Sequence, residues 1–233
     1  MTQGSPKRSP VVFLLDVDNT LLNNDRVSDD LRRHLTREVG AQRQERYWAI
    51  FEELRVELGY ADYLGALQRY RVENPHDSHL LAVSTFMINY PFANRLYPGS
   101  LDAIDHLKTM GPTVILSDGD VVFQPRKIEC SGLFEQVEGN ILIYIHKELE
   151  LEDVERRYPA DHYVLVDDKV RILTAIKKSW GTRVTTVFPR QGHYALADEV
   201  AKYPTPDITI ESIGEVVGLD RATLLTKAAP TPK

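Results

Sequence analysis

Short apolar runs recur along this chain, and segments with helical spacing lie between them. The runs cover residues 11–17, 113–116, 141–145, 163–166, 184–188 and 208–210. They are short, rich in β-branched side chains and not strictly alternating, which is typical of strands buried on both faces of a parallel sheet. The helical segments cover residues of about 100–110, 121–131, 170–179 and 193–202. This alternation predicts an α/β fold with a doubly wound, Rossmann-like parallel sheet.

The stretch between the first and second runs departs from this pattern, because it contains no convincing strand. It divides into helical pieces at residues 29–39, 42–58, 61–71 and 78–89. Large apolar side chains fall on one face of the second piece: Tyr47, Phe51, Leu54 and Leu58. We therefore expect a small all-helical domain at residues 23–96, inserted into an α/β core domain formed by residues 1–22 and 97–233. Residues 23–25 and 94–99 would be its hinges.

Composition and charge narrow the class of protein. Of the 233 residues, 42% are hydrophobic and 27% are charged, as is usual for a globular protein. The net charge of −6 and the lack of a basic run in the sequence argue against a nucleic-acid partner. The apolar runs are too short to span a membrane, so we expect no membrane partner either.

The ends of the chain and its cysteine content indicate where the protein works. The first ten residues lack the apolar segment of a signal peptide, and Cys130 is the only cysteine, so no internal disulfide can form. We expect a cytoplasmic protein with tails at residues 1–10 and after residue 227. The sequence leaves the oligomeric state open.

Polar side chains follow four of the predicted strands, at the point where each strand ends. Asp16, Asp18 and Thr20 follow the first strand, Ser117 and Asp118 the second, Lys147 the third, and Asp167 and Asp168 the fourth. In a parallel sheet these ends lie at one edge, where α/β proteins bind their ligands. Residues that are far apart in the sequence should therefore converge on one crevice.

The charges of this crevice predict a metal ion. Four carboxylates, from Asp16, Asp18, Asp167 and Asp168, would meet there, and Lys147 offsets only one of them. A hard divalent cation with oxygen ligands is the natural complement, and Mg²⁺ binds through few carboxylates together with waters and phosphate oxygens. One carboxylate can then attack an electrophile while another moves a proton. A hydroxyl and an ammonium nearby can hold an anionic group, which suits phosphoryl transfer.

Four short motifs resemble those of the haloacid dehalogenase superfamily. They are DVDNT at residues 16–20, LSDG around Ser117, IHKE around Lys147, and VDD at residues 166–168. The resemblance covers residues 11–179, with the motifs in the expected order and each at a strand end. It implies a helical cap inserted after the first strand, whose closure excludes water and sets the choice of substrate.

The resemblance also implies a role for each residue. Asp16 would be the nucleophile that forms an aspartyl-phosphate, and Asp18 the general acid and base, with its backbone carbonyl on Mg²⁺. Lys147 would hold the phosphoryl group and restrain Asp16. Other phosphate-binding residues would be Thr20, which supports the loop, Ser117 and Asp118. Asp168 would bind the metal directly, and Asp167 directly or through water.

Asp18 favours one reaction within the superfamily. Members that cleave carbon–halogen bonds lack this second aspartate and use no metal, because a halide leaves without a proton. A phosphate ester releases an alkoxide, which needs a proton in order to leave. We therefore expect a Mg²⁺-dependent phosphatase that acts on a small phosphorylated metabolite. A phosphomutase and a 2-haloacid dehalogenase are the alternatives within the superfamily, and a non-catalytic binding module is the alternative outside it.

Several of these residues also have structural explanations. Ser117 and Asp118 could form a turn, and Asp167 and Asp168 could cap the helix that follows them. Lys127 competes with Lys147 for the role of the active-site lysine. We expect Lys147 to fill it, because it follows a strand, and Lys127 to be a solvated helix residue.

Overall fold

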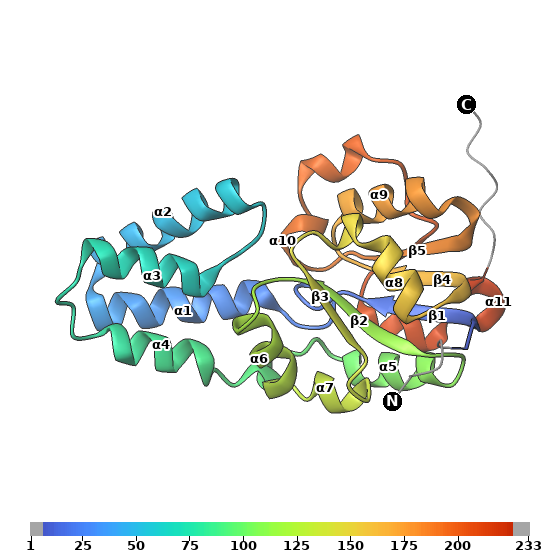
Figure 1. Cartoon of the computed structure of the whole chain (residues 1–233), viewed down its shortest axis with the longest axis horizontal. Helices are drawn as coiled ribbons and strands as arrows, with labels where there is room; N and C mark the ends of the chain where they lie inside the picture. Colours follow the sequence, from blue (N-terminus) through green and yellow to red (C-terminus); the bar gives the residue numbers. More distant parts are fainter. Residues whose placement is uncertain (1–6, 226–233) are drawn as a thin grey trace.

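A computed structural model describes residues 7–225, and six parallel strands within this range form one sheet (Figure 1). The strands are β1 (Ser9–Leu15), β2 (Thr113–Asp118), β3 (Ile141–Tyr144), β4 (Ala160–Val166), β5 (Val184–Pro189) and β6 (Ile208–Ile210). Their order is β3-β2-β1-β4-β5-β6, so the chain winds away from β1 in both directions. This confirms the doubly wound, Rossmann-like sheet, and it puts the point of reversal, where such folds bind ligands, at β1 and β4.

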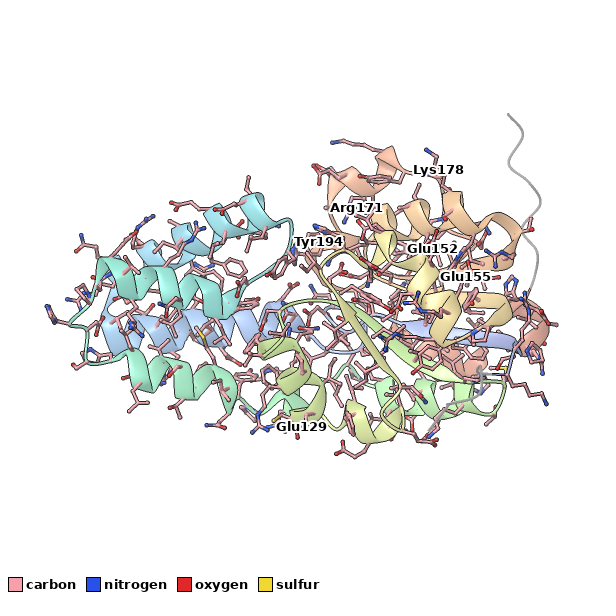
Figure 2. All side chains as sticks on the ribbon, in the orientation of Figure 1. Glu129, Glu152, Glu155, Arg171, Lys178 and Tyr194 are labelled. Atoms are coloured by element: carbon pink, nitrogen blue, oxygen red, sulfur yellow. The ribbon has the colours of Figure 1, made fainter. Side chains whose placement is uncertain are left out.

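Both faces of the sheet are covered, which explains why the strands are apolar throughout. Along β1, Val11, Phe13 and Leu15 pack into one core with helices α5 (Ser100–Lys108) and α6 (Phe123–Cys130). Val12 and Leu14 point to the other face, where they pack with α8 (Leu151–Arg157) and α9 (Val170–Trp180). Charged side chains of the covering helices, such as Glu129 and Lys178, project outward (Figure 2).

Four helices between β1 and β2 form a bundle beside the sheet (Figure 1). They are α1 (Asn24–Val39), α2 (Ala41–Leu58), α3 (Tyr63–Glu73) and α4 (Leu80–Ile88), followed by the short turn η1 (Phe92–Arg95). Aromatic side chains fill its interior, and Phe51 lies 4.7 Å from Tyr63 between ring centroids. Tyr63 also reaches Phe123 of α6 at 5.1 Å, so the cores of the bundle and the sheet are continuous.

Some element boundaries differ from those expected. Helix α1 begins at Asn24, because the side chain of Asn23 accepts the N–H of Arg26, so residues 24 and 25 are helical. The expected helix at 193–202 is wrong: the segment forms α10 (Gly192–Ala195) and the turn η4 (Asp198–Lys202). The extended backbone of Ala197 (ψ 143°) separates the two. Two further helices are short: α7 (Leu133–Gln136) follows α6, and α11 (Arg221–Leu224) follows β6.

The sheet reaches into the expected N-terminal tail. Strand β1 begins at Ser9, whose N–H donates to the carbonyl of Pro159 at 2.8 Å, so residues 9 and 10 belong to the sheet and not to the expected tail. The rest of that expectation, at residues 1–6, and the expected tail after residue 227 lie outside the described residues. In the part of the chain that the structure describes, none of the helices has both the length and the hydropathy needed to cross a bilayer.

Candidate active site

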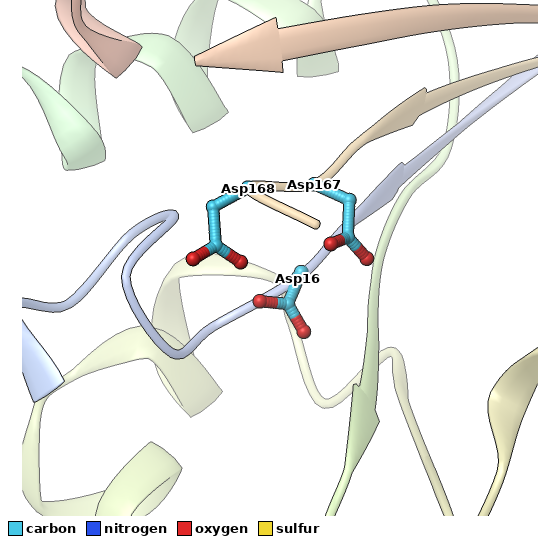
Figure 3. A group of neighbouring side chains, drawn as sticks. All are labelled: Asp16, Asp167 and Asp168. Carbon is cyan, nitrogen blue, oxygen red and sulfur yellow. The ribbon is translucent and has the colours of Figure 1, made fainter. Parts of the chain in front are cut away.

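Three buried carboxylates meet where β1 and β4 end side by side (Figure 3). Oxygen atoms of Asp16, Asp167 and Asp168 lie within 4.8 Å of one another. Neither carboxylate oxygen of Asp168 has a hydrogen-bond partner among the described residues, although both are buried. A buried, unpaired carboxylate is costly. Closely spaced carboxylate oxygens are the ligands that a hard divalent cation such as Mg²⁺ requires, so these residues fit a metal.

The pKa values record the same crowding. Burial raises the pKa of Asp168 well above its usual value, and the charges of Asp16 and Asp167 raise it further. Burial also raises the pKa of Asp167, to about 6, although Lys147 and Lys169 oppose the shift. Both carboxylates are thus disfavoured as free anions, and a bound cation would relieve this.

Lys147 lies between two of these carboxylates and is fully buried. Its Nζ is 2.6 Å from Asp16 Oδ1 and 2.7 Å from Asp167 Oδ2, and it donates to the carbonyl of Leu116 at 3.2 Å. Burial would lower the pKa of this ammonium, but the neighbouring carboxylates raise it well above its usual value. Lys147 therefore stays charged and restrains Asp16. It lies in the turn η2 (Lys147–Leu149), shortly after β3 rather than directly at its end.

Lys127 also reaches the site, so the expectation that it is a solvated helix residue was wrong. Only 1% of its surface is exposed, and its Nζ lies 2.6 Å from Asp18 Oδ1 and 3.0 Å from Asn24 Oδ1. The spacing on α6 held the signal, because Lys127 follows the buried Phe123 by four residues and so shares its face. Each catalytic aspartate that we expected thus has its own lysine.

The remaining predicted residues surround this centre. Thr20 Oγ1 donates to Asp16 Oδ2 at 3.3 Å and accepts the N–H of Asp168 at 3.0 Å, so it ties the two strand ends together. Ser117 Oγ is buried and accepts a hydrogen bond from Gln124 Nε2 at 2.9 Å.

Two aspartates also hold backbone groups. Asp118 Oδ1 accepts the N–H of Lys147 at 2.7 Å. Asp167 Oδ1 accepts the N–H of Lys169 at 2.8 Å, whereas the Asp168 carboxylate has no hydrogen-bond partner among the described residues. The N-cap of α9 is Lys169, and no side chain caps this helix, so the expectation that Asp167 and Asp168 are capping residues was wrong.

A cavity of about 300 Å³ adjoins the charged centre, with Asp18 and Lys127 in its wall. The sequence did not single out three of its lining residues: Arg55, Lys169 and Tyr194. They come from α2, from the start of α9 and from α10, and no spacing rule connects these segments.

Comparisons with known proteins agree with this geometry. The sequence profile of the haloacid dehalogenase-like hydrolases matches residues 11–179. A crystal structure from Burkholderia xenovorans LB400, described as a haloacid dehalogenase-like hydrolase, is 64% identical (TM-score 0.88), with 91% of this chain and 99% of that one covered.

Two more distant structures share the fold. An L-2-haloacid dehalogenase from Xanthobacter autotrophicus, with chloropropionic acid covalently bound, is 17% identical (TM-score 0.57; 90% and 97% covered). The hydrolase YfnB from Bacillus subtilis, bound to magnesium, is 16% identical (TM-score 0.60; 94% and 100% covered). The search of curated proteins found no match.

Proposed function

The chain belongs to the haloacid dehalogenase-like hydrolase family, and from this premise we propose that it is a Mg²⁺-dependent phosphatase acting on a small phosphorylated metabolite. One observation supports this most: neither oxygen of the buried Asp168 carboxylate, which lies next to Asp16 and Asp167, has a hydrogen-bond partner in the described part of the chain. A bound cation would supply the missing interaction. The magnesium bound to YfnB is a precedent within the fold.

We also propose that the protein works in the cytoplasm. Cys130 is the only cysteine of this chain, and a protein without disulfides suits a reducing compartment.

The residues divide the proposed reaction into two displacements. Asp16 attacks phosphorus, the bond from phosphorus to the ester oxygen breaks, and the leaving alkoxide takes a proton from Asp18. Asp18 then removes a proton from a water molecule, which attacks phosphorus and releases phosphate and Asp16. When bound to Asp16, Asp167, Asp168 and the Asp18 carbonyl, Mg²⁺ would neutralise phosphoryl charge.

The two lysines orient the carboxylates for these steps. Lys147 holds Asp16 through Oδ1, and we infer that its ammonium and the Ser117 hydroxyl, with Thr20 and Asp118 supporting them, bind the phosphoryl oxygens. Lys127 holds Asp18 through Oδ1, so we place proton exchange at Oδ2. We also propose that α1–α4 act as a cap domain (residues 23–96) over a core domain of residues 1–22 and 97–233.

Dehalogenation is the second candidate, because the dehalogenase from X. autotrophicus has the same fold. We expect phosphate release from at least one monoester in a panel of phosphorylated metabolites, and EDTA should abolish it until Mg²⁺ is restored. Chloride release from 2-chloropropionate that survives EDTA would instead establish the dehalogenase. Transfer that needs a bisphosphate activator and frees little phosphate would establish the phosphomutase.

Replacing either buried lysine with Met should slow the proposed reaction. Lys147→Met removes the cation beside the nucleophile, and we expect kcat to fall about 10²- to 10³-fold, as when one stabilising donor is lost. Lys127→Met should lower kcat about tenfold, because Asp18 loses its orientation but not its chemistry. Initial rates at saturating Mg²⁺ measure both, and Lys178→Met, an exposed change on α9, is the control. A larger loss for Lys127→Met would assign the main phosphate-binding role to Lys127.

A further inference from the structure

The cavity beside the charged centre is lined by both charged and aromatic side chains. Asp18 and Lys127 belong to its wall, and Lys127 Nζ lies 5.4 Å from the centroid of the Phe123 ring. Five aromatic side chains contribute to the lining: Tyr60, Tyr63, Phe123, Tyr194 and Tyr203. Its volume of about 300 Å³ is at the lower end for ligand pockets, so it suits a small metabolite rather than a polymer.

Tyr194 is held in one orientation by three contacts. Its hydroxyl accepts a hydrogen bond from Arg55 Nη1 of α2 at 3.1 Å. The centroid of its ring lies 3.9 Å from the centroid of the His193 ring and 5.1 Å from the Nζ of Lys169. In Figure 2 it is labelled on the side of the core that faces the helical bundle. An aromatic wall that is fixed in advance loses little entropy when a ring stacks on it.

The rings that come from the bundle and from α6 are held as firmly. Tyr63 is buried, and its hydroxyl is 2.8 Å from Ser28 Oγ and accepts from Asn24 Nδ2 at 3.2 Å. Its ring centroid lies 5.1 Å from that of Phe123. Tyr63 and Phe123 come from separate segments of the chain and are 4% and 2% exposed, so Tyr60, Tyr194 and Tyr203 are the more exposed rings of the lining.

The cations of the lining have partners, which argues against a second acidic group on the substrate. The ion pairs are Arg55 with Glu52 (2.7 Å), Arg171 with Glu148 (2.7 Å) and Lys127 with Asp18 (2.6 Å). Lys169 lies over the Tyr194 ring. Burial would lower the pKa of Lys169, but the charges of Asp16, Asp168 and Asp167 outweigh this and raise it. The charges here are balanced without a ligand anion beyond the phosphoryl group.

We propose that this cavity binds a flat aromatic or heteroaromatic ring on the alcohol part of the substrate, which rests on the proposed phosphatase function. The substrate is then the phosphate monoester of a ring-bearing alcohol. A polyol of similar size would have to compete for Arg55, Arg171 and Lys127, which already bind carboxylates. A stacked ring gains dispersion and apolar burial from the same surfaces.

Three primary alkyl phosphates test this with leaving groups of similar basicity. Benzyl phosphate supplies a flat ring, cyclohexylmethyl phosphate an apolar ring that is not flat, and glycerol 3-phosphate a polyol. We expect kcat/KM for benzyl phosphate to exceed that for either of the others at least tenfold, about the effect of one stacked ring. Equal values for benzyl and cyclohexylmethyl phosphate, or a preference for glycerol 3-phosphate, would overturn the proposal.

Variants of Tyr194 locate the effect. Tyr194→Leu should lower kcat/KM for benzyl phosphate about tenfold, mainly through KM, and that for glycerol 3-phosphate less than about twofold. Tyr194→Phe keeps the ring and should retain the preference. Leu196→Ala is the control, since Leu196 is 71% exposed on the same segment and lies outside the cavity lining. An equal loss for both substrates in Tyr194→Leu would contradict a ring-binding wall.

A binding measurement separates this proposal from the proposed function. The Asp16→Asn variant with Mg²⁺ is titrated with benzyl phosphate and glycerol 3-phosphate in a calorimeter. Tighter binding of benzyl phosphate supports the ring site even if the wild-type protein hydrolyses neither ester, so the ring site stands or falls independently of the phosphatase proposal. Equal binding of the two esters overturns the ring site, whatever the wild-type protein hydrolyses.

Discussion

Replacing Asp16 with Asn is expected to abolish phosphate release while the protein stays folded. Asp16 is the carboxylate that both Lys147 and Thr20 hold, at the end of the central strand β1. An amide of the same shape cannot form an aspartyl-phosphate, and loss of a catalytic nucleophile lowers kcat by up to about 10⁶-fold. Initial rates of phosphate release with saturating Mg²⁺ measure this loss.

Two further measurements make the Asp16 result specific. Asp220→Asn is the matched control, because Asp220 caps α11 through the N–H of Thr223, and Asn caps a helix equally well. It should keep full activity. Acid quenching during turnover of a phosphorus-labelled ester should leave label on the wild-type protein and none on Asp16→Asn. Label or turnover that survives the substitution would remove Asp16 from its proposed role.

Replacing Asp168 with Asn should weaken Mg²⁺ binding and stabilise the metal-free protein. Neither of its buried oxygens has a hydrogen-bond partner within residues 7–225, and burial and the charges of Asp16 and Asp167 raise its pKa well above the usual value. An amide there removes one of three crowded charges, so the metal-free protein should melt at a higher temperature. Removing a residue that only hydrogen-bonds to a ligand weakens metal binding by up to about 100-fold. Loss of a direct ligand should therefore weaken Mg²⁺ binding by more than this.

Thermal unfolding at increasing Mg²⁺ concentration measures both effects on one sample. Wild-type protein should gain about 2.7 kcal/mol of stability when Mg²⁺ reaches 100 times its Kd. Asp168→Asn should gain almost none at that concentration, and Asp220→Asn should behave as the wild type. If Asp168→Asn and the wild type gain the same stability at each Mg²⁺ concentration, Asp168 is excluded as a ligand.

Local patterns in the sequence were enough to predict the sheet and most of the centre. The apolar runs could be recognised as strands because both faces of β1 are covered, so Val12 and Phe13 are equally buried. Parallel strands end at one edge, and this predicts that Asp16 lies near Asp168. The break at Ala197 escaped prediction because helical spacing persists across it in the sequence.

The sequence by itself determined which strands form and which polar residues follow them, because strand burial and chain adjacency are local properties. Tertiary packing decided what those residues contact. It turned Lys127 inward onto Asp18, left the Asp168 carboxylate without a hydrogen-bond partner among the residues that the structure describes, and brought Tyr194 of α10 to Arg55 of α2. Contacts of this kind depend on how α6, α10 and the helical bundle pack against the sheet, and no short-range pattern encodes that packing.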